Sequence, residues 1–197
     1  MDYGTALNLI NDTITQNSST NGPGGGVNNI AGALSVSDCT IINNTASKPG
    51  AGIHVLSGTG SINNCIVAQD TITNSTTPSD LSGSFAGSNN LIGDGSGGLS
   101  TTNHNLLGST SSLLNPKLGS LASNGGPTLT MMPLSGSPVI DAGSNSLIPT
   151  GITTDQRGYA RIFNGTVDIG AVEFGASLSP GLVSDSVSTP LTARRRA

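Results

Sequence analysis

Aromatic and charged residues are scarce in this chain of 197 residues. Aromatic residues make up 3% of the sequence, tryptophan is missing, and 9% of the residues are charged. Mean hydropathy is nevertheless +0.01, which excludes a disordered polyelectrolyte, because such chains are too hydrophilic to bury a core. Serine, threonine, asparagine and glycine fill the remaining positions, and this composition indicates short strands joined by turns.

Basic side chains are few, and none occurs before Lys48. The formal net charge is −4 and the isoelectric point is near 4.7. A protein that follows a phosphate backbone needs clustered lysine and arginine side chains. The sequence therefore predicts no nucleic-acid partner.

Long apolar runs and helical periodicity are also absent. The chain contains 28 glycines and 10 prolines, which disfavour long helices, and no window shows an apolar period of about 3.6 residues. No run of about 18 apolar residues could cross a membrane. The opening residues lack the basic start and apolar stretch of a signal peptide. The sequence predicts an all-β chain without a transmembrane segment.

An internal repeat is the main positive feature of the sequence. The block VSDCTIINN at 36–44 aligns with INNCIVAQD at 62–70, 26 residues later, and with LINDTITQN at 9–17, 27 residues earlier. The glycine-rich steps GGGV at 24–27 and GAGI at 50–53 are also 26 residues apart. A period of about 20–50 residues with short strands and turns is typical of a solenoid, in which each coil covers the apolar face of the next.

Apolar residues recur at equivalent positions of these coils, as the inward-facing side chains of stacked parallel strands require. Crossovers between parallel strands are overwhelmingly right-handed. We therefore predict a right-handed parallel β-helix of about six coils or fewer. The two columns that are apolar in all three copies are Leu9, Val36 and Ile62, and Ile14, Ile41 and Val67.

Two further columns of the repeat contain polar groups or thiols. Asn17 and Asn44 share one column, where stacked amides can form a hydrogen-bonded ladder, and Asp70 ends it. Cys39 and Cys65 share another column and are predicted to be neighbours on successive coils, within the Cα range of about 4.4–6.8 Å that a disulfide tolerates. We expect buried thiols and no required bridge, and the sequence leaves their redox state open.

The repeat resembles that of a known protein class. The steps GGGV and GAGI alternate with ITQN at 14–17 and IINN at 41–44. They resemble the Gly-Gly-apolar and aromatic-x-x-Asn repeats of polymorphic outer-membrane proteins, with isoleucine in place of the usual aromatic residue.

Three later segments carry a more specific resemblance. They are NNLIGDGSGG at 89–98, NGGPTLTMMPLSGSPVIDAGSN at 124–145 and TTDQRGYARIFNGTVDIGAVEF at 153–174. Together they resemble the C-terminal part of bacterial proteins that carry a choice-of-anchor Q domain, a pectin-lyase-like β-helix, over roughly residues 7–174. The resemblance implies an extracellular or cell-surface bacterial protein and does not imply catalysis.

The C-terminal part of the repeat region holds the candidate catalytic residues. Asp155, Asp168 and Glu173 lie close in sequence to Arg157 and Arg161, and three of the five aromatic residues of the chain fall in the same stretch. The acids could form an acid/base pair or a cation site. We favour a structural interpretation, in which a cap near 150–174 closes the open end of the stack through ion pairs and turns.

No metal or cofactor site is predicted elsewhere. His54 and His104 have no partner histidine, cysteine or carboxylate at metal-ligand spacing. We interpret both as surface or turn residues.

The alternative to a passive surface module is a polysaccharide lyase or glycoside hydrolase, since both use β-helix scaffolds. A lyase needs a base, and a hydrolase needs two carboxylates about 5–10 Å apart on one face. Asp12, Asp38 and Asp70 fall in different columns of the repeat. The sequence therefore favours a non-enzymatic structural or adhesive, adhesin-like role, with glycans or surface proteins as partners.

The two ends of the chain complete the predicted organisation. Residues 1–174 form the β-helix domain with its cap, and 175–197, a Ser/Pro-rich stretch without alternation, form a flexible, disordered tail. The repeat begins almost at once, so the first coil has little to cover it. We expect either further coils before Met1 in a longer chain or a partner that covers the first coil.

Overall fold

A computed structural model describes residues 6–176 of the chain. This part is a parallel β-solenoid of about three turns with almost no helix, so the predicted fold class is confirmed. The strands are short because a turn residue follows every two to four residues. Nearly all of the predicted tail, residues 177–197, lies outside the described residues, as do residues 1–5.

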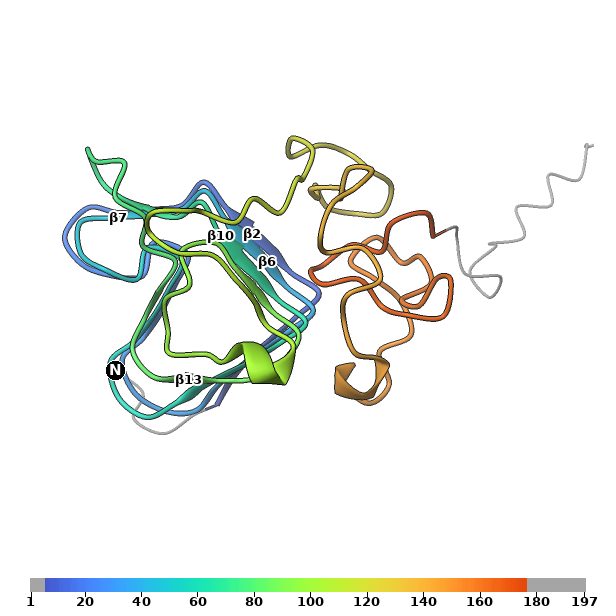
Figure 1. The fold of residues 1–197 in the computed structure, drawn as a ribbon, viewed down its shortest axis with the longest axis horizontal. Helices are drawn as coiled ribbons and strands as arrows, with labels where there is room; N and C mark the ends of the chain where they lie inside the picture. The colour runs from blue at the N-terminus through green and yellow to red at the C-terminus, as the bar shows by residue number, and fades with distance from the viewer. Residues whose placement is uncertain (1–5, 177–197) are drawn as a thin grey trace, which may run out of the picture.

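Two of the four sheets meet at a corner of each coil and carry most of the strands, all of which pair in parallel. In Figure 1 the view runs along the solenoid, so that successive coils overlie one another. The first sheet contains β1 (Leu7–Ile10), β5 (Leu34–Ser37), β9 (Gly60–Asn63) and β13 (Phe85–Ala86). The second contains β2 (Thr13–Thr15), β6 (Thr40–Ile42), β10 (Ile66–Ala68), β14 (Leu91–Ile92) and β15 (Leu106–Leu107).

Two smaller sheets complete each coil, and two single-turn 3₁₀ helices follow later in the chain. The third sheet contains β3 (Ser18–Ser19), β7 (Thr45–Ala46) and β11 (Thr71–Ile72). The fourth contains β4 (Val27–Asn29), β8 (Ile53–Val55) and β12 (Leu81–Ser82). The 3₁₀ helices are η1 (Thr101–Asn103) and η2 (Asn145–Leu147).

The predicted register between coils is confirmed residue by residue. The N–H of Ile66 donates to the carbonyl of Cys39 at 2.9 Å, which places Cys39 and Cys65 side by side, and both are buried free thiols. The paired apolar columns are Leu9, Val36 and Ile62, and Ile14, Ile41 and Val67.

The corners of the coils depend on residues with a left-handed backbone. Between the first and second sheets, each coil turns at one residue with φ between 51° and 56°. Asparagine and aspartate tolerate this conformation better than other non-glycine residues. These corner residues are Asn11, Asp38, Asn64 and Asn89.

The second sheet is buried on both faces. Ile41 and Val67 point into the solenoid core, whereas Ile66 belongs to a second apolar cluster with Val139 and Ile169. The latter two residues come from the C-terminal lobe, which we define as residues 116–176. Figure 1 shows this lobe in yellow to red beside β2, β6 and β10.

The position of the C-terminal lobe corrects the expected cap. The sequence placed residues 150–174 over the open end of the stack, but their contacts follow the flank of the coils. The side chain of Asn11 donates to the carbonyl of Thr154 at 2.8 Å, and that of Asn89 donates to the carbonyl of Ala142 at 3.1 Å. The lobe thus extends along the stack from the corner after β1 to the corner after β13, because its apolar residues cover the outer face of the second sheet.

Candidate functional site

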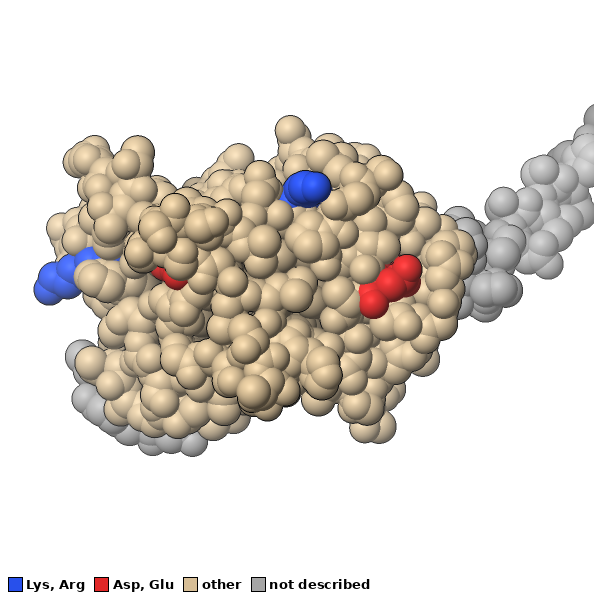
Figure 2. Space-filling view, in the orientation of Figure 1, with Lys and Arg blue, Asp and Glu red and all other residues tan. Residues whose placement is uncertain are grey.

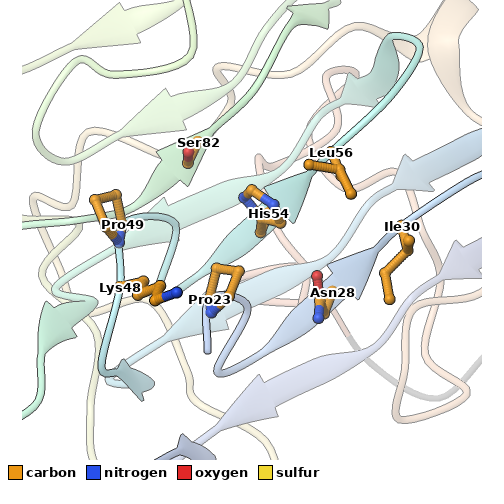
Figure 3. Close-up of a pocket in the computed structure, with 8 residues that line it drawn as sticks. All are labelled: Pro23, Asn28, Ile30, Lys48, Pro49, His54, Leu56 and Ser82. Atoms are coloured by element: carbon orange, nitrogen blue, oxygen red, sulfur yellow. The ribbon is translucent and has the colours of Figure 1, made fainter. Parts of the chain in front are cut away.

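A groove of about 440 Å³ lies on the outer face of the fourth sheet. Figure 3 shows its floor, formed by one residue from each strand of that sheet. This face of the solenoid is on a different side from the C-terminal lobe (Figure 1). The lining residues are Pro23, Asn28, Ile30, Lys48, Pro49, His54, Leu56 and Ser82.

The floor of the groove follows from strand alternation and coil register. In β4 the side chains of Val27 and Asn29 are buried and that of Asn28 is exposed between them, because successive side chains of a strand point to opposite faces. The same alternation turns His54 of β8 outward. Asn28 pairs with His54, and His54 pairs with Ser82 of β12, so three polar side chains from successive coils form one column.

Apolar side chains form the two walls. In Figure 3, Pro49 and Pro23 lie to the left of His54, and Leu56 and Ile30 lie to its right. Ile30 is 49% exposed and Leu56 is 64% exposed. Exposed apolar side chains beside a polar floor are a feature of ligand grooves.

The polar groups of the groove differ in their access to a ligand. Burial lowers the pKa of His54, so its imidazole is neutral at neutral pH. Its Nδ1 atom is buried and has no hydrogen-bond partner within the described residues. Lys48 is exposed, and the ion pairs of residues 6–176 involve Arg157 and Arg161 and not this lysine.

The groove is therefore positive. None of its eight lining residues is an aspartate or a glutamate, so the ammonium group of Lys48 faces no carboxylate there. Figure 2 shows one face of the molecule, on which charged side chains are sparse. A single cation in such surroundings has few competing counter-charges.

The predicted site residues lie elsewhere, in the C-terminal lobe. Asp155 is buried and forms an ion pair with Arg157 at 2.7 Å, and it also accepts hydrogen bonds from the backbone N–H groups of Tyr159 and Glu173. Burial raises the pKa of Asp168, which accepts hydrogen bonds from two backbone N–H groups.

Glu173 is engaged in the same way. Its two carboxylate oxygens accept hydrogen bonds from the backbone N–H groups of Phe163 and Asp168, both at 2.9 Å, and burial raises its pKa to about 7. The oxygens of these three acids organise the backbone of the C-terminal lobe. This geometry favours the structural interpretation of the acids.

Comparisons of the chain with protein-family models, curated proteins and solved structures find no match. The geometry of the described residues therefore carries the functional argument. Within residues 6–176, no group of three or more His, Cys, Asp or Glu side chains is arranged to hold a metal ion. The same part of the chain contains no helix with the length and apolar character needed to cross a membrane.

The sequence interpretation missed the groove. His54 was expected at the surface or in a turn; it lies in the middle of β8, where it faces outward into the groove and is half-buried. His104 occupies a turn, with φ of 56° at the end of η1. The 26-residue register that pairs Asn28 with His54 was visible in the sequence, since Val27 and Ile53 were already aligned.

A cluster of carboxyl groups was also missed. Among the acids, Asp70 was compared only with Asp12 and Asp38, whereas the structure brings it to Asp80 and Asp94. All three members of this cluster are buried. Neither later aspartate lies within the aligned blocks of the repeat, so column counting could not find them.

Proposed function

We propose that this chain is a non-enzymatic binding segment of a bacterial cell-surface or secreted protein, and that its groove holds a stretch of an acidic polysaccharide. The observation that carries this proposal is the exposed Lys48, which belongs to no ion pair of the described residues, in a groove with apolar walls and a polar floor that includes His54.

The chemistry of the groove matches the two faces of a sugar ring. The C–H face of a pyranose packs on Pro23, Ile30 or Leu56, and its hydroxyl groups bond to Asn28 and His54. A carboxylate or sulfate group on the sugar pairs with the Lys48 ammonium. That pair has no carboxylate competitor among the lining residues.

The solenoid favours weak, repeated contact over one tight site. Strands of successive coils lie about 4.8 Å apart, so equivalent outward side chains recur at short intervals along an extended ligand. Several weak contacts along one polymer add through effective concentration. This behaviour suits an adhesive surface module.

The family and location are part of the same proposal. The parallel solenoid and the ordered motifs at 89–98, 124–145 and 153–174 support a pectin-lyase-like fold of the choice-of-anchor Q type. Proteins that carry this domain are exported, which supports an extracellular or cell-surface location. Expression of the natural gene with an epitope tag, followed by cell fractionation, tests this part, and recovery of all tagged protein in the cytosol contradicts it.

A polysaccharide lyase is the second candidate, and one observation favours it. The neutral imidazole of His54 can accept a proton, and Lys48 can neutralise a substrate carboxylate in the same groove. Incubation of the protein with uronate polymers, with and without calcium, tests this candidate by absorbance of unsaturated products. Sustained release of unsaturated products by the wild type, lost in His54→Ala, would show that the groove is catalytic and would overturn the binding role.

The binding proposal is tested by a pair of lysine variants. Lys48→Met removes the groove cation, and Lys117→Met is the matched control, because the Nζ atom of Lys117 donates to the carbonyl of Gly136 in the C-terminal lobe. We expect Lys48→Met to weaken binding to an immobilised polyuronate about tenfold, or ~1.4 kcal/mol, and Lys117→Met to leave it unchanged.

Neutral polysaccharides complete the design. Binding of a neutral glucan should be insensitive to Lys48→Met and weakened by Leu56→Ala, which removes part of the apolar wall. Equal loss in both lysine variants indicates non-specific charge attraction and overturns the groove assignment. Absence of binding to every acidic and neutral polymer refutes the function itself.

A further inference from the structure

A ladder of side chains runs through the corner between the second and third sheets. It consists of Asn17, Asn44 and Asp70 on successive coils. At the first step, the backbone N–H and the Nδ2 group of Asn17 both donate to Oδ1 of Asn44, at 3.1 and 3.0 Å. At the second step, the same two groups of Asn44 donate to Oδ1 of Asp70, at 2.7 and 2.9 Å.

The Nδ2 group of Asn44 has further acceptors. It donates to the carbonyl oxygens of Ile14 and Ile42, at 3.1 and 3.3 Å. The amide nitrogen therefore lies among carbonyl oxygens, where a donor is required.

Asp70 places an oxygen where the ladder requires this donor. Two equivalent glycines locate the atom: a Cβ built on Gly26 lies 3.1 Å from Nδ2 of Asn44, and one built on Gly52 lies 2.5 Å from Oδ2 of Asp70. Gly26 and Gly52 are equivalent because Val27 pairs with Ile53. Oδ2 of Asp70 is buried and accepts no hydrogen bond from the described residues, so no donor there stabilises a negative charge.

We infer that Asp70 is a protonated carboxylic acid whose Oδ2–H replaces the amide donor of asparagine, so that the ladder and the third coil are stable only while this proton is bound. A neutral carboxyl group has the shape of a carboxamide and the same arrangement of one donor and one acceptor. Loss of the proton places a negative charge among acceptors in a buried site, which is costly.

The groups around Asp70 favour the neutral form. The backbone N–H of Asp70 donates to Oδ1 of Asp80 at 3.1 Å. Asp80 and Asp94 exchange hydrogen bonds, in which each backbone N–H donates to the other's carboxyl group, at 3.0 and 2.8 Å. The charged or titratable groups that act on Asp70 are these two acids, and neither belongs to an ion pair of the described residues.

A cavity of about 280 Å³ adjoins this cluster and is lined by Asp70, Asp80, Gly93 and Leu114, among others. The cavity lies between residues 69–71 of the third coil and Leu113–Asn115, the residues just before the C-terminal lobe. Space for water beside the acids provides a path for a proton and a place where the structure can open.

The direction of the pH effect follows from burial. Burial, followed by the charge of Asp80, raises the pKa of Asp70 well above its usual value. Burial, followed by the charge of Asp94, raises the pKa of Asp80 from 3.8 to about 8. A raised pKa in the folded state means that the stabilisation is complete below the unfolded pKa and is lost as the pH rises through the folded pKa. Stability should therefore decline from near pH 4 to above about pH 8.

Asp70→Asn supplies the donor at every pH and tests the inference. We expect the urea midpoint of this variant to match the wild type at about pH 5 and to exceed it at about pH 9. Asp12→Asn is the control, because Asp12 lies in the column of Cys39 and outside the ladder. The pH dependence of this control should run parallel to that of the wild type.

A second measurement needs no variant. Carboxyl ¹³C NMR of the wild-type protein, with aspartate resonances assigned through the backbone, should show Asp70 protonated at about pH 6. Titration of Asp70 near pH 4 overturns the inference, and so does an Asp70→Asn curve parallel to that of the wild type. Glycan binding at about pH 5 does not depend on the outcome, so this inference and the proposed function fail independently.

Discussion

Replacement of Asn44 by alanine is expected to be one of the most destabilising polar substitutions in the solenoid. The side chain is fully buried, and it makes five hydrogen bonds, two as acceptor from Asn17 and three as donor. Alanine leaves the carbonyl of Ile14 and Oδ1 of Asp70 with fewer partners. A buried polar group left unsatisfied costs about 1–3 kcal/mol, so we expect a total loss of about 2–4 kcal/mol.

Asn17→Ala is the matched control for this prediction. Asn17 lies in the same column but is exposed, so water replaces its lost hydrogen bonds and the cost should be about 0.5–1 kcal/mol. Urea unfolding followed by far-ultraviolet circular dichroism measures both variants. With an m value of about 2 kcal/mol/M, the midpoint of Asn44→Ala should fall by about 1–2 M. A midpoint equal to that of Asn17→Ala would show that the buried ladder does not stabilise the coils.

Three further predictions concern other parts of the molecule. Arg161→Met removes a buried ion pair with Asp38, 3.2 Å long. Urea unfolding should show a destabilisation of about 3–5 kcal/mol. The double variant with Asp38→Asn should recover part of that loss. Gly87→Ala should prevent folding or strongly lower the urea midpoint, because a Cβ there would collide with the carbonyl oxygen of Ile62. Gly98→Ala is the control: it is also at positive φ but in open space, and it should cost about 1 kcal/mol of stability. The buried thiols of Cys39 and Cys65 should react with a thiol reagent only as fast as the protein unfolds, and rapid labelling of the native protein would contradict their placement in the core.

The repeat made the solenoid core predictable. The alignment of Cys39 with Cys65 fixed the register, and every apolar column that it implied is present. This prediction succeeded because a parallel stack repeats its side-chain environments at a constant offset, so one correct pairing determines the others.

The lobe was misplaced in the prediction because the evidence for its position lies in the outward-facing residues of the second sheet, which are buried and mostly apolar. Thr40, Ile41 and Ile42 are all buried, and so are Ile66, Val67 and Ala68. A continuous apolar strand indicates a sheet covered on both faces. That pattern was present in TII at 40–42 and IVA at 66–68. Local sequence could not identify the distant segment that covers this face.

The groove was missed for a different reason. His54 was judged as an isolated residue, and Lys48, six residues earlier, was noted only as the first basic residue. Coil register brings the histidine between Asn28 and Ser82. The lysine reaches the same groove from the turn before β8. The residues of a turn do not pair in register between coils, so the repeat does not predict where their side chains lie.

The lobe along the flank changes how the coils share stability. In a simple solenoid each coil contacts only its neighbours, and unfolding can spread from either end one coil at a time. Here Thr13 of the first coil bonds to Gln156 across 143 residues of sequence, so the earliest coil is joined directly to one of the last segments. Such non-local contacts slow folding. Because of them, the first coil can unfold only when its contacts with the lobe are broken. We therefore expect the coils of residues 6–176 to unfold as one cooperative unit, in which the contacts of Asn11 and Thr13 form only after the lobe has been synthesised.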